Sequence, residues 1–469
     1  MISLLILLPA LSVIILNLPF GRLMRKIAFS LCLALFVAQI FIVLLPVSAG
    51  FEPIFQFNLM VDDLSRVVLF CIGIVLSSAL FVGEHVIKDD DQRFNFLNLL
   101  LIALAGMNGI VMVKDVFSMY VFLEITAVAS FVLISLYRDR DALEAAFKYF
   151  VLSAVATVLM LSSIALLLLV SGDTGFSAIN AAIITSQHSR LVMMAMGLFI
   201  CGLFIKGGLM PFHGWLPDAY SAAPAPVSIL LAGIVTKTVG IYALIRIVTL
   251  VFVFNDPIKY LLMFVGALSI VLGALAALGQ SDFKRMLAYS SISQVGYIII
   301  GLGCGTPLGI FGAVFHLLNH AIFKTLLFVN AAAVESETGS RDMDRMSGLA
   351  EKMPLTGITS VLAVLSTAGI PPLSGFWSKL LIIMALWISG YRIYAVIAVA
   401  ASVITLAYFL SLQRRVFWGK LGKEFGHIKE PGFMMAFPAL VLAFIIVAVG
   451  ILFPYLAHEF INLKELTGG

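Results

Sequence analysis

The amino-acid sequence predicts an all-α polytopic membrane protein. Hydrophobic residues make up 62% of the 469 residues and charged residues only 12%, with a mean hydropathy of +1.11. A soluble domain carries about 25% charged residues, so the composition excludes the ordinary soluble classes. The hydrophobic runs are long and continuous, whereas a membrane β-barrel would show alternating segments of about ten residues. Helices are therefore expected throughout.

The predicted spans follow from the length of these runs. A membrane-spanning helix needs about 20 mainly apolar residues, and hydropathy finds roughly fourteen such runs. The first run has no basic residue before it, which favours a retained span over a cleaved signal peptide. In order, the predicted spans lie near 2–17, 27–48, 63–85, 94–113, 115–137, 142–170, 190–210, 226–253, 258–279, 283–304, 308–334, 355–388, 392–418 and 433–457.

Lysine and arginine are unevenly distributed between the two sets of loops. Loops after odd-numbered spans hold 18 of these residues, and loops after even-numbered spans hold six. Lys284 is counted among the 18. Positively charged loops stay in the cytoplasm, so we expect a cell inner (plasma) membrane protein with both termini on the outer side. Arg246, one of the six, is expected to extend to the membrane surface. The net charge of +4 is scattered and predicts no nucleic-acid partner.

Seven ionisable residues lie deep inside the predicted spans. A lysine at the bilayer centre costs about 2.5–3.5 kcal/mol, and such residues by default mark ion pathways or proton relays. One acidic residue cannot neutralise four lysines, which disfavours a purely structural ion pair. The two histidines and the third lysine follow one another at spacings of four, on one helix face. The candidate site residues are Glu124, Lys206, Lys237, His316, His320, Lys324 and Lys379.

Other polar residues near the spans have more ordinary interpretations. Lys148 and Glu144 are one helical turn apart and are expected to form an interfacial pair. Asp218, after Pro217, is expected to cap a short helix. For His213 the sequence leaves a relay and a capping role open.

A short Gly/Pro pattern occurs twice, each time inside a long apolar run. "GLMPFHGW" (208–215) and "GIPPLSGF" (369–376) share a first glycine, a proline in fourth place, a glycine in seventh and an aromatic residue in eighth. The offset of 161 residues covers about five spans, and an odd number of spans inverts one unit relative to the other. Paired interrupted spans point to a transporter's ion path, because freed backbone groups are tolerated only against protein or water.

Three stretches of the sequence resemble the motifs of one membrane-protein family. They are "KGGLMPFHGWLPDAYSAAPAPVSILLAGIVTKTVGIYALIR" (206–246), "FHLLNHAIFKTLLF" (315–328) and "GIPPLSGFWSK" (369–379). This family comprises the antiporter-like proton-translocating membrane subunits of respiratory complex I, Mrp-type Na+/H+ antiporters and membrane-bound hydrogenases. The resemblance runs over nearly the whole chain.

The resemblance implies an architecture of fourteen helices. Two inverted five-helix repeats would comprise spans four to eight and nine to thirteen, with broken helices at spans seven and twelve. The corresponding divisions are N-terminal helices in 1–93, the first repeat in 94–253, the second repeat in 254–418, and a last span with a tail in 419–469.

The resemblance also implies roles for the buried residues. Glu124 would pair with Lys206, and Lys237 would pass the proton toward the centre. The central relay would be His316, His320 and Lys324, and Lys379 would be the terminal lysine of the second half-channel.

Within the family, two features leave three types: the Mrp D-type subunits, their hydrogenase-complex relatives and one remaining complex I type. The sequence stops soon after the last span, without the long lateral helix of the largest complex I type. Position 379 is lysine, where another complex I type has glutamate. The stretch "SETGSRDMDRMSGLAEKMP" (336–354) favours the first two of the three types.

The function expected is that of a proton-translocating subunit in a multisubunit ion-pumping complex. Its partners would be other membrane subunits, including further antiporter-like ones. The sequence has no CxxC, CxxCH or Rossmann GxGxxG motif, so we expect no cofactor or metal here and assign any redox chemistry to partner subunits. The main alternative is an Mrp antiporter subunit of the D type exchanging sodium for protons, although sodium prefers clustered oxygen ligands. A non-conducting scaffold and a quinone-reducing enzyme are less favoured.

Overall fold

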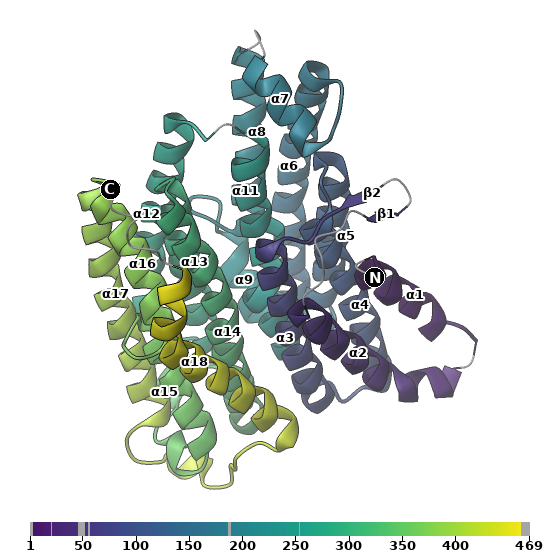
Figure 1. Cartoon of the computed structure of the whole chain (residues 1–469). Helices are drawn as coiled ribbons and strands as arrows, with labels where there is room; N and C mark the ends of the chain where they lie inside the picture. Colours follow the sequence, from purple (N-terminus) through teal and green to yellow (C-terminus); the bar gives the residue numbers. More distant parts are fainter. Residues whose placement is uncertain are drawn as a thin grey trace. The chain divides into compact units, whose positions relative to one another are not determined.

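The chain folds almost entirely into helices. The computed structural model describes residues 3–19, 21–45, 52–54, 57–185, 189–252 and 254–460. Within these ranges the only strands are β1 (Glu52–Ile54) and β2 (Phe57–Leu59), which form a short antiparallel hairpin. The predicted all-α membrane fold is therefore confirmed (Figure 1).

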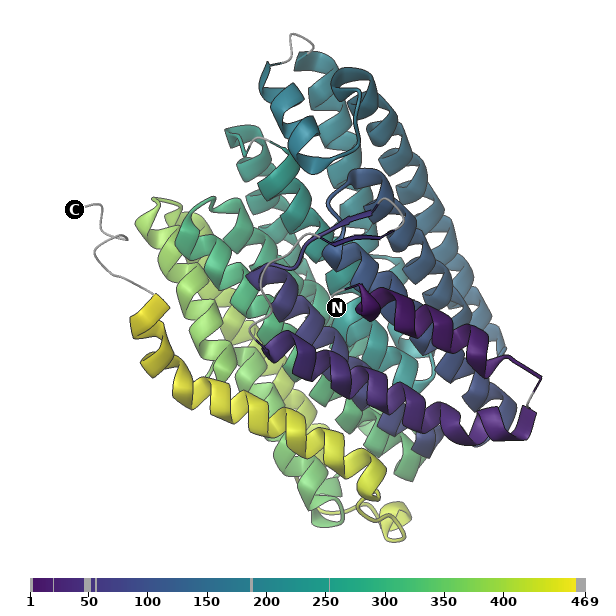
Figure 2. The same ribbon diagram turned by 45° about the vertical axis from the view of Figure 1, so that its right-hand side comes forward.

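The first of two compact units comprises Met1–Gly208 and Phe212–Asn255. Figure 2 shows its first two helices side by side in purple. Its helices are α1 (Leu4–Leu16), α2 (Gly21–Leu44), α3 (Asp63–Val86), α4 (Asp90–Met112), α5 (Val116–Ile134), α6 (Arg140–Ser171), α7 (Phe176–Thr185), α8 (Ser189–Gly207), α9 (Trp215–Ala222), α10 (Ala225–Leu230) and α11 (Ala243–Arg246), with π-helical segments η1 (Leu231–Val235), η2 (Lys237–Tyr242) and η3 (Ile247–Val251).

The second unit comprises Leu209–Pro211 and Asp256–Gly469. In it the last helix, α18, packs against α14, α15 and α16. Its helices are α12 (Asp256–Leu278), α13 (Phe283–Gly303), α14 (Pro307–Thr338), α15 (Pro354–Ala368), α16 (Ser374–Ile388), α17 (Arg392–Leu412) and α18 (Phe433–Phe460), with the short segments η4 (Met343–Arg345), η5 (Leu349–Glu351), η6 (Gln413–Phe417) and η7 (Lys423–Phe425).

Twelve helical stretches of the described residues are long and apolar enough to cross a membrane. The two other predicted spans fall short for different reasons. The first, α1, has 13 described residues. The span expected over 355–388 divides into α15 and α16, each of 15 residues. The short helix α7, between two spans, was not predicted.

Both Gly/Pro patterns interrupt a helix. In the first, α8 ends at Gly207 and Gly208 adopts a φ of +65° before α9 begins. In the second, α15 ends at Ala368 and Gly369 adopts a φ of +86° before α16 begins. Glycine takes up this left-handed backbone without steric cost, and the prolines that follow cannot donate a helical hydrogen bond. The inverted layout of the two repeats stays a prediction.

Aspartate caps start five of the helices. The side chain at the N-cap of α3, α4, α5, α6 and α13 accepts a hydrogen bond from a backbone N–H three residues later. Such a bond satisfies one of the free N–H groups of a helix start and is worth about 1 kcal/mol. These carboxylates fix where the spans begin, and they account for part of the acidic residues outside the apolar runs.

Candidate functional site

An ion pair between Glu124 on α5 and Lys206 on α8 lies inside the first unit. Lys206 Nζ is 2.9 Å from Glu124 Oε1 and also donates to Ser153 Oγ on α6 at 2.6 Å. The Oγ1 atom of Thr157, also on α6, donates to Glu124 Oε1 at 2.7 Å. The lysine side chain is fully buried and the glutamate side chain is 27% exposed. The lysine charge is therefore held by one carboxylate and one hydroxyl.

The break after α8 is tied back to the helix that it interrupts. On α9, Trp215 donates from Nε1 to the carbonyl oxygen of Ile205 at 3.0 Å. Its indole ring stacks on Tyr149 of α6, with ring centroids 4.0 Å apart and planes 9° from parallel. These contacts hold the two halves of the broken span next to Lys206 without a continuous helix.

Lys237 occupies a separate position in the first unit. It begins the π-helical segment η2, is fully buried, and donates from Nζ to the carbonyl oxygen of Ala232 and to Thr236 Oγ1 at 3.4 Å. Thr236 Oγ1 in turn lies 2.8 Å from the Tyr220 hydroxyl. Among the described residues no carboxylate lies within ion-pair distance of Lys237, so hydroxyl and carbonyl groups alone solvate its amine.

In the second unit, α14 carries His316, His320 and Lys324, all fully buried. The two imidazole rings are 6.4 Å apart between centroids. Lys324 Nζ donates to Ser290 Oγ on α13 at 2.7 Å. The Ser290 hydroxyl lies 2.8 Å from that of Tyr408 on α17. Three buried titratable groups, spaced by four residues, therefore lie on this one helix, as the sequence predicts.

Lys379 on α16 is linked to His316 through an aromatic side chain. Its Nζ lies 4.4 Å from the centre of the Tyr297 ring and 3.4 Å from Ser402 Oγ. The Tyr297 ring is 5.7 Å from the imidazole of His316, whose Nδ1 lies 2.9 Å from Ser378 Oγ. A cation over a tyrosine face is stabilised by about 1–2 kcal/mol. This partly offsets the cost of burying Lys379, which has no carboxylate partner among the residues that the structure describes.

The structure therefore gathers the predicted residues into groups within each unit. Glu124 and Lys206 are in direct contact in the first unit, whereas Lys237 bonds Ala232 and Thr236 and neither member of that pair. In the second unit, Lys379 and His316 both contact the Tyr297 ring, whereas Lys324 bonds Ser290. Buried amines and imidazoles surrounded by hydroxyls are chemically suited to exchanging protons.

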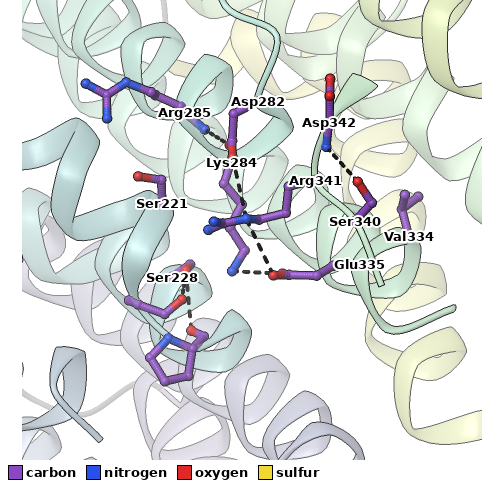
Figure 3. A network of polar contacts seen from close by, with 12 residues as sticks. Ser221, Ser228, Asp282, Lys284, Arg285, Val334, Glu335, Ser340, Arg341 and Asp342 are labelled. Carbon is purple, nitrogen blue, oxygen red and sulfur yellow. Dashed lines mark hydrogen bonds and ion pairs between the residues drawn. The ribbon is translucent and has the colours of Figure 1, made fainter. Parts of the chain in front are cut away.

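A second buried ion pair was missed by the sequence interpretation. Lys284 in the first turn of α13 has a side chain only 3% exposed, and its Nζ lies 2.9 Å from Glu335 Oε2 near the end of α14 (Figure 3). Arg341 Nε is 3.8 Å from the other oxygen of Glu335 and 3.5 Å from Asp282. Lys284 stands beside a span end, so its sequence position is indistinguishable from that of a loop lysine.

Arg246 is buried instead of extending to the membrane surface. It is 5% exposed and donates to both oxygens of Asp62, the N-cap of α3, with one contact at 2.6 Å, and to Ser65 Oγ at 2.8 Å. Burial raises the pKa of Asp62, but the bonds and charge of Arg246 outweigh that effect and lower it to about 2. The expectation of a surface-directed arginine was wrong, because a partner 184 residues away in sequence neutralises it.

Two smaller expectations meet different outcomes. Lys148 and Glu144 do pair, with Nζ 2.8 Å from Oε1. The expectation that Asp218 caps α9 was wrong, because the N-cap is Gly214 and the Asp218 carboxylate, in the first turn, pairs with Lys148 at 2.8 Å. Across the described ranges, no group of three or more histidine, cysteine, aspartate or glutamate side chains could hold a metal ion.

Comparison with known proteins identifies the family. The family described as NADH:quinone oxidoreductase/Mrp antiporter, TM, matches residues 113–405. The chain belongs to this family. This antiporter-like membrane subunit is 33% identical over 410 residues to NADH-quinone oxidoreductase subunit N of Desulforudis audaxviator, covering 85% of this chain and 81% of that protein. It is also 33% identical over 367 residues to the D-type subunit of the Na(+)/H(+) antiporter of Alkalihalophilus pseudofirmus, covering 78% and 74%.

Solved structures of multisubunit membrane complexes contain similar chains. A chain of the Mrp complex from Dietzia sp. DQ12-45-1b matches with a TM-score of 0.88 at 25% identity, covering 97% of this subunit and 95% of that chain. A chain of the membrane-bound sulfane sulfur reductase, an archaeal respiratory complex, matches with a TM-score of 0.84 at 28% identity, covering 97% and 94%. A chain of respiratory complex I from Thermus thermophilus shares the fold of this subunit, with a TM-score of 0.86.

Proposed function

We propose that this antiporter-like subunit translocates protons within a multisubunit ion-pumping membrane complex. The observation that carries the proposal is the ion pair between Glu124 and the fully buried Lys206 at a helix break. Further buried amines and imidazoles lie on η2, α14 and α16. Retaining one such group inside a membrane is costly, and retaining seven is expected only where they serve an ion pathway.

In the proposed mechanism, the pair with Glu124 holds Lys206 protonated. A signal from a partner subunit weakens the pair, and Lys206 then releases its proton toward Lys237. From there the proton passes by way of water and the residues of α14 to Lys379, and exits. No covalent bond other than those to the moving proton is made or broken. The protein therefore has to set the proton affinity of each residue along the route.

The complex and the membrane are part of the same proposal. The similar chains of known structure come from an Mrp complex and a sulfane sulfur reductase complex, which supports other membrane subunits, including further antiporter-like ones, as partners. We place this subunit in the plasma membrane with both termini outside, on the bias of lysine and arginine between loops. The inverted repeats 94–253 and 254–418 complete the proposed arrangement. Redox cofactors would belong to the partners.

Proton uptake by proteoliposomes containing the purified complex tests the function. Lys206→Ala should reduce uptake by about a hundredfold, the loss typical for a positioned proton donor or acceptor. The matched control is Lys259→Ala, which removes a partly exposed lysine paired with Asp256 on α12. Undiminished uptake in an assembled Lys206→Ala complex would exclude this role.

A second candidate function is exchange of sodium for protons. It is favoured by the 33% identity to the D-type subunit of a Na(+)/H(+) antiporter. The same proteoliposomes distinguish the two, because proton movement that requires sodium on the opposite side supports exchange. Proton movement of equal rate in sodium-free medium supports the proton-only mechanism.

A further inference from the structure

The contact between α6 and α9 joins the protein surface to the Glu124–Lys206 pair. At its outer end, Lys148 on α6 bonds Asp218 on α9 at 2.8 Å, and the lysine side chain is 45% exposed. One residue further along α6, Tyr149 stacks on Trp215 of α9 and is buried. An exposed ion pair therefore adjoins a buried aromatic stack on the same two helices.

One face of α6 carries three hydroxyl groups, two of which contact the ion pair. Tyr149, Ser153 and Thr157 follow at intervals of four residues, which places them above one another on the helix. Ser153 Oγ accepts from Lys206 Nζ at 2.6 Å, and Thr157 donates to Glu124 at 2.7 Å. Tyr149 is close enough to Glu124 for the two to interact electrostatically. A buried helix face is ordinarily apolar, so three hydroxyl-bearing residues in a row on this face call for an explanation.

The surroundings of the Tyr149 hydroxyl group are a second observation that supports a proton route along α6. It is buried, with the side chain 1% exposed, and has no hydrogen-bond partner among the described residues. A buried hydroxyl without a partner is destabilising, whereas phenylalanine would preserve the ring stack with Trp215. Such a group is usually satisfied by ordered water, which would place water between the exposed ion pair and Ser153.

We propose that the α6–α9 contact is the proton entrance to Lys206, with Ser153 as its relay residue and Tyr149 positioning the water that resupplies Ser153. This inference rests on the proposed function and names the route that supplies it. The Ser153 hydroxyl gives its proton to the neutral amine of Lys206, and its oxygen takes a replacement from a water molecule bonded to Tyr149. That water regains a proton from the aqueous surface beside Asp218. One proton enters, Lys206 becomes an ammonium ion, and both hydroxyls end as they began.

Two hydroxyl deletions in the purified complex test the entrance. Ser153→Ala and Tyr149→Phe should each slow proton uptake by proteoliposomes at least about tenfold. This effect is smaller than the roughly hundredfold loss expected when a positioned proton donor is removed. Ser153→Thr keeps the hydroxyl and should restore uptake, which a purely steric role would not predict. The matched control is Ser163→Ala on the same helix, whose buried hydroxyl bonds the Ala195 carbonyl at 2.6 Å.

Comparison with Lys206→Ala separates the two proposals. If Lys206→Ala stops uptake while Ser153→Ala and Tyr149→Phe both retain the parent rate, the entrance is wrong and the function stands. If Lys206→Ala also retains the parent rate, the proposed function itself fails. Should Ser153→Ala prevent assembly, Tyr149→Phe decides the matter alone, because it keeps the ring and its stack.

Discussion

Gly240 of η2 packs directly against Gly207, the last residue of α8. A Cβ atom built on Gly240 would lie 2.3 Å from the Cα of Gly207 and 2.5 Å from its backbone nitrogen. Real Cβ atoms do not approach backbone so closely, and backbone cannot move aside as a flexible side chain can. The absence of a side chain at position 240 is therefore what allows η2, which begins at Lys237, to pack against the end of α8 beside Lys206.

Replacing this glycine should separate the two segments. We expect Gly240→Ala to lower stability by about 1–3 kcal/mol, as overpacking does, and to slow proton uptake because Lys206 is displaced. The thermal unfolding midpoint of the detergent-purified protein measures the first effect. Gly197→Ala on α8 is the control, since a Cβ there meets nothing within 4 Å. Equal midpoints for the two variants would contradict the close packing.

The bond between Asp62 and Arg246 should make stability depend on acidity. The folded-state pKa of Asp62 is about 2, below its ordinary 3.8, owing to Arg246 despite burial. A depressed carboxyl pKa adds stability that is complete above the unfolded pKa and is lost as pH falls through the folded one. Asp62→Asn should therefore melt below the parent near neutral pH, and the difference should close between about pH 4 and pH 2. Melting curves across that range measure it.

The neighbouring acid provides the comparison for that titration. Asp63 is exposed in the first turn of α3 and shares its helix start with Asp62. Asp63→Asn removes one negative charge at the same helix terminus without touching the arginine. A pH-dependent difference of equal size in both variants would show that the helix terminus, and not Arg246, is responsible.

The sequence predicts the fold well because span length and apolar continuity are local properties. Each predicted run meets a helix, and both breaks occur where glycine and proline interrupt the apolar pattern. The π-helical turns around Lys237 were not foreseen, because nothing in a continuous apolar run distinguishes them from α-helix. The division of one span into two helices of 15 residues was foreseen as a break, without the length of either part.

Ionisable residues were predicted only where they stand deep inside a run. Lys206 and Lys379 are conspicuous there, whereas Lys284 is equally buried but sits beside the end of a run. Its partner Glu335 is 51 residues away in the sequence, and one sequence alone carries no signal for such a pair. Burial at a span end depends on the loops and helices around it, which hydropathy does not describe.

The Lys284–Glu335 pair should behave as a buried charge pair in a double-mutant cycle. Glu335→Met leaves Lys284 buried without its carboxylate, and we expect a loss of about 3 kcal/mol. Adding Lys284→Met should restore most of that loss, because well-packed apolar residues replace a buried ion pair at little cost. Unfolding midpoints of the four proteins measure the coupling. Glu337→Met, two residues along α14, is the control, and additive effects in the cycle would contradict the interaction.

The hydroxyl that binds Lys324 provides the most closely matched pair of variants. Ser290 accepts from Lys324 Nζ at 2.7 Å and contacts the Tyr408 hydroxyl, whereas its neighbour Ser291 donates to the Leu287 carbonyl of its own helix at 3.0 Å. Ser290→Ala removes a partner of a buried amine and leaves Tyr408 without its contact, so proton uptake should fall about tenfold if Lys324 carries the proton. Ser291→Ala deletes the same atom one position away and should keep the parent rate. Equal rates for both variants in assembled complexes would show that the solvation of Lys324 by Ser290 does not matter for transport.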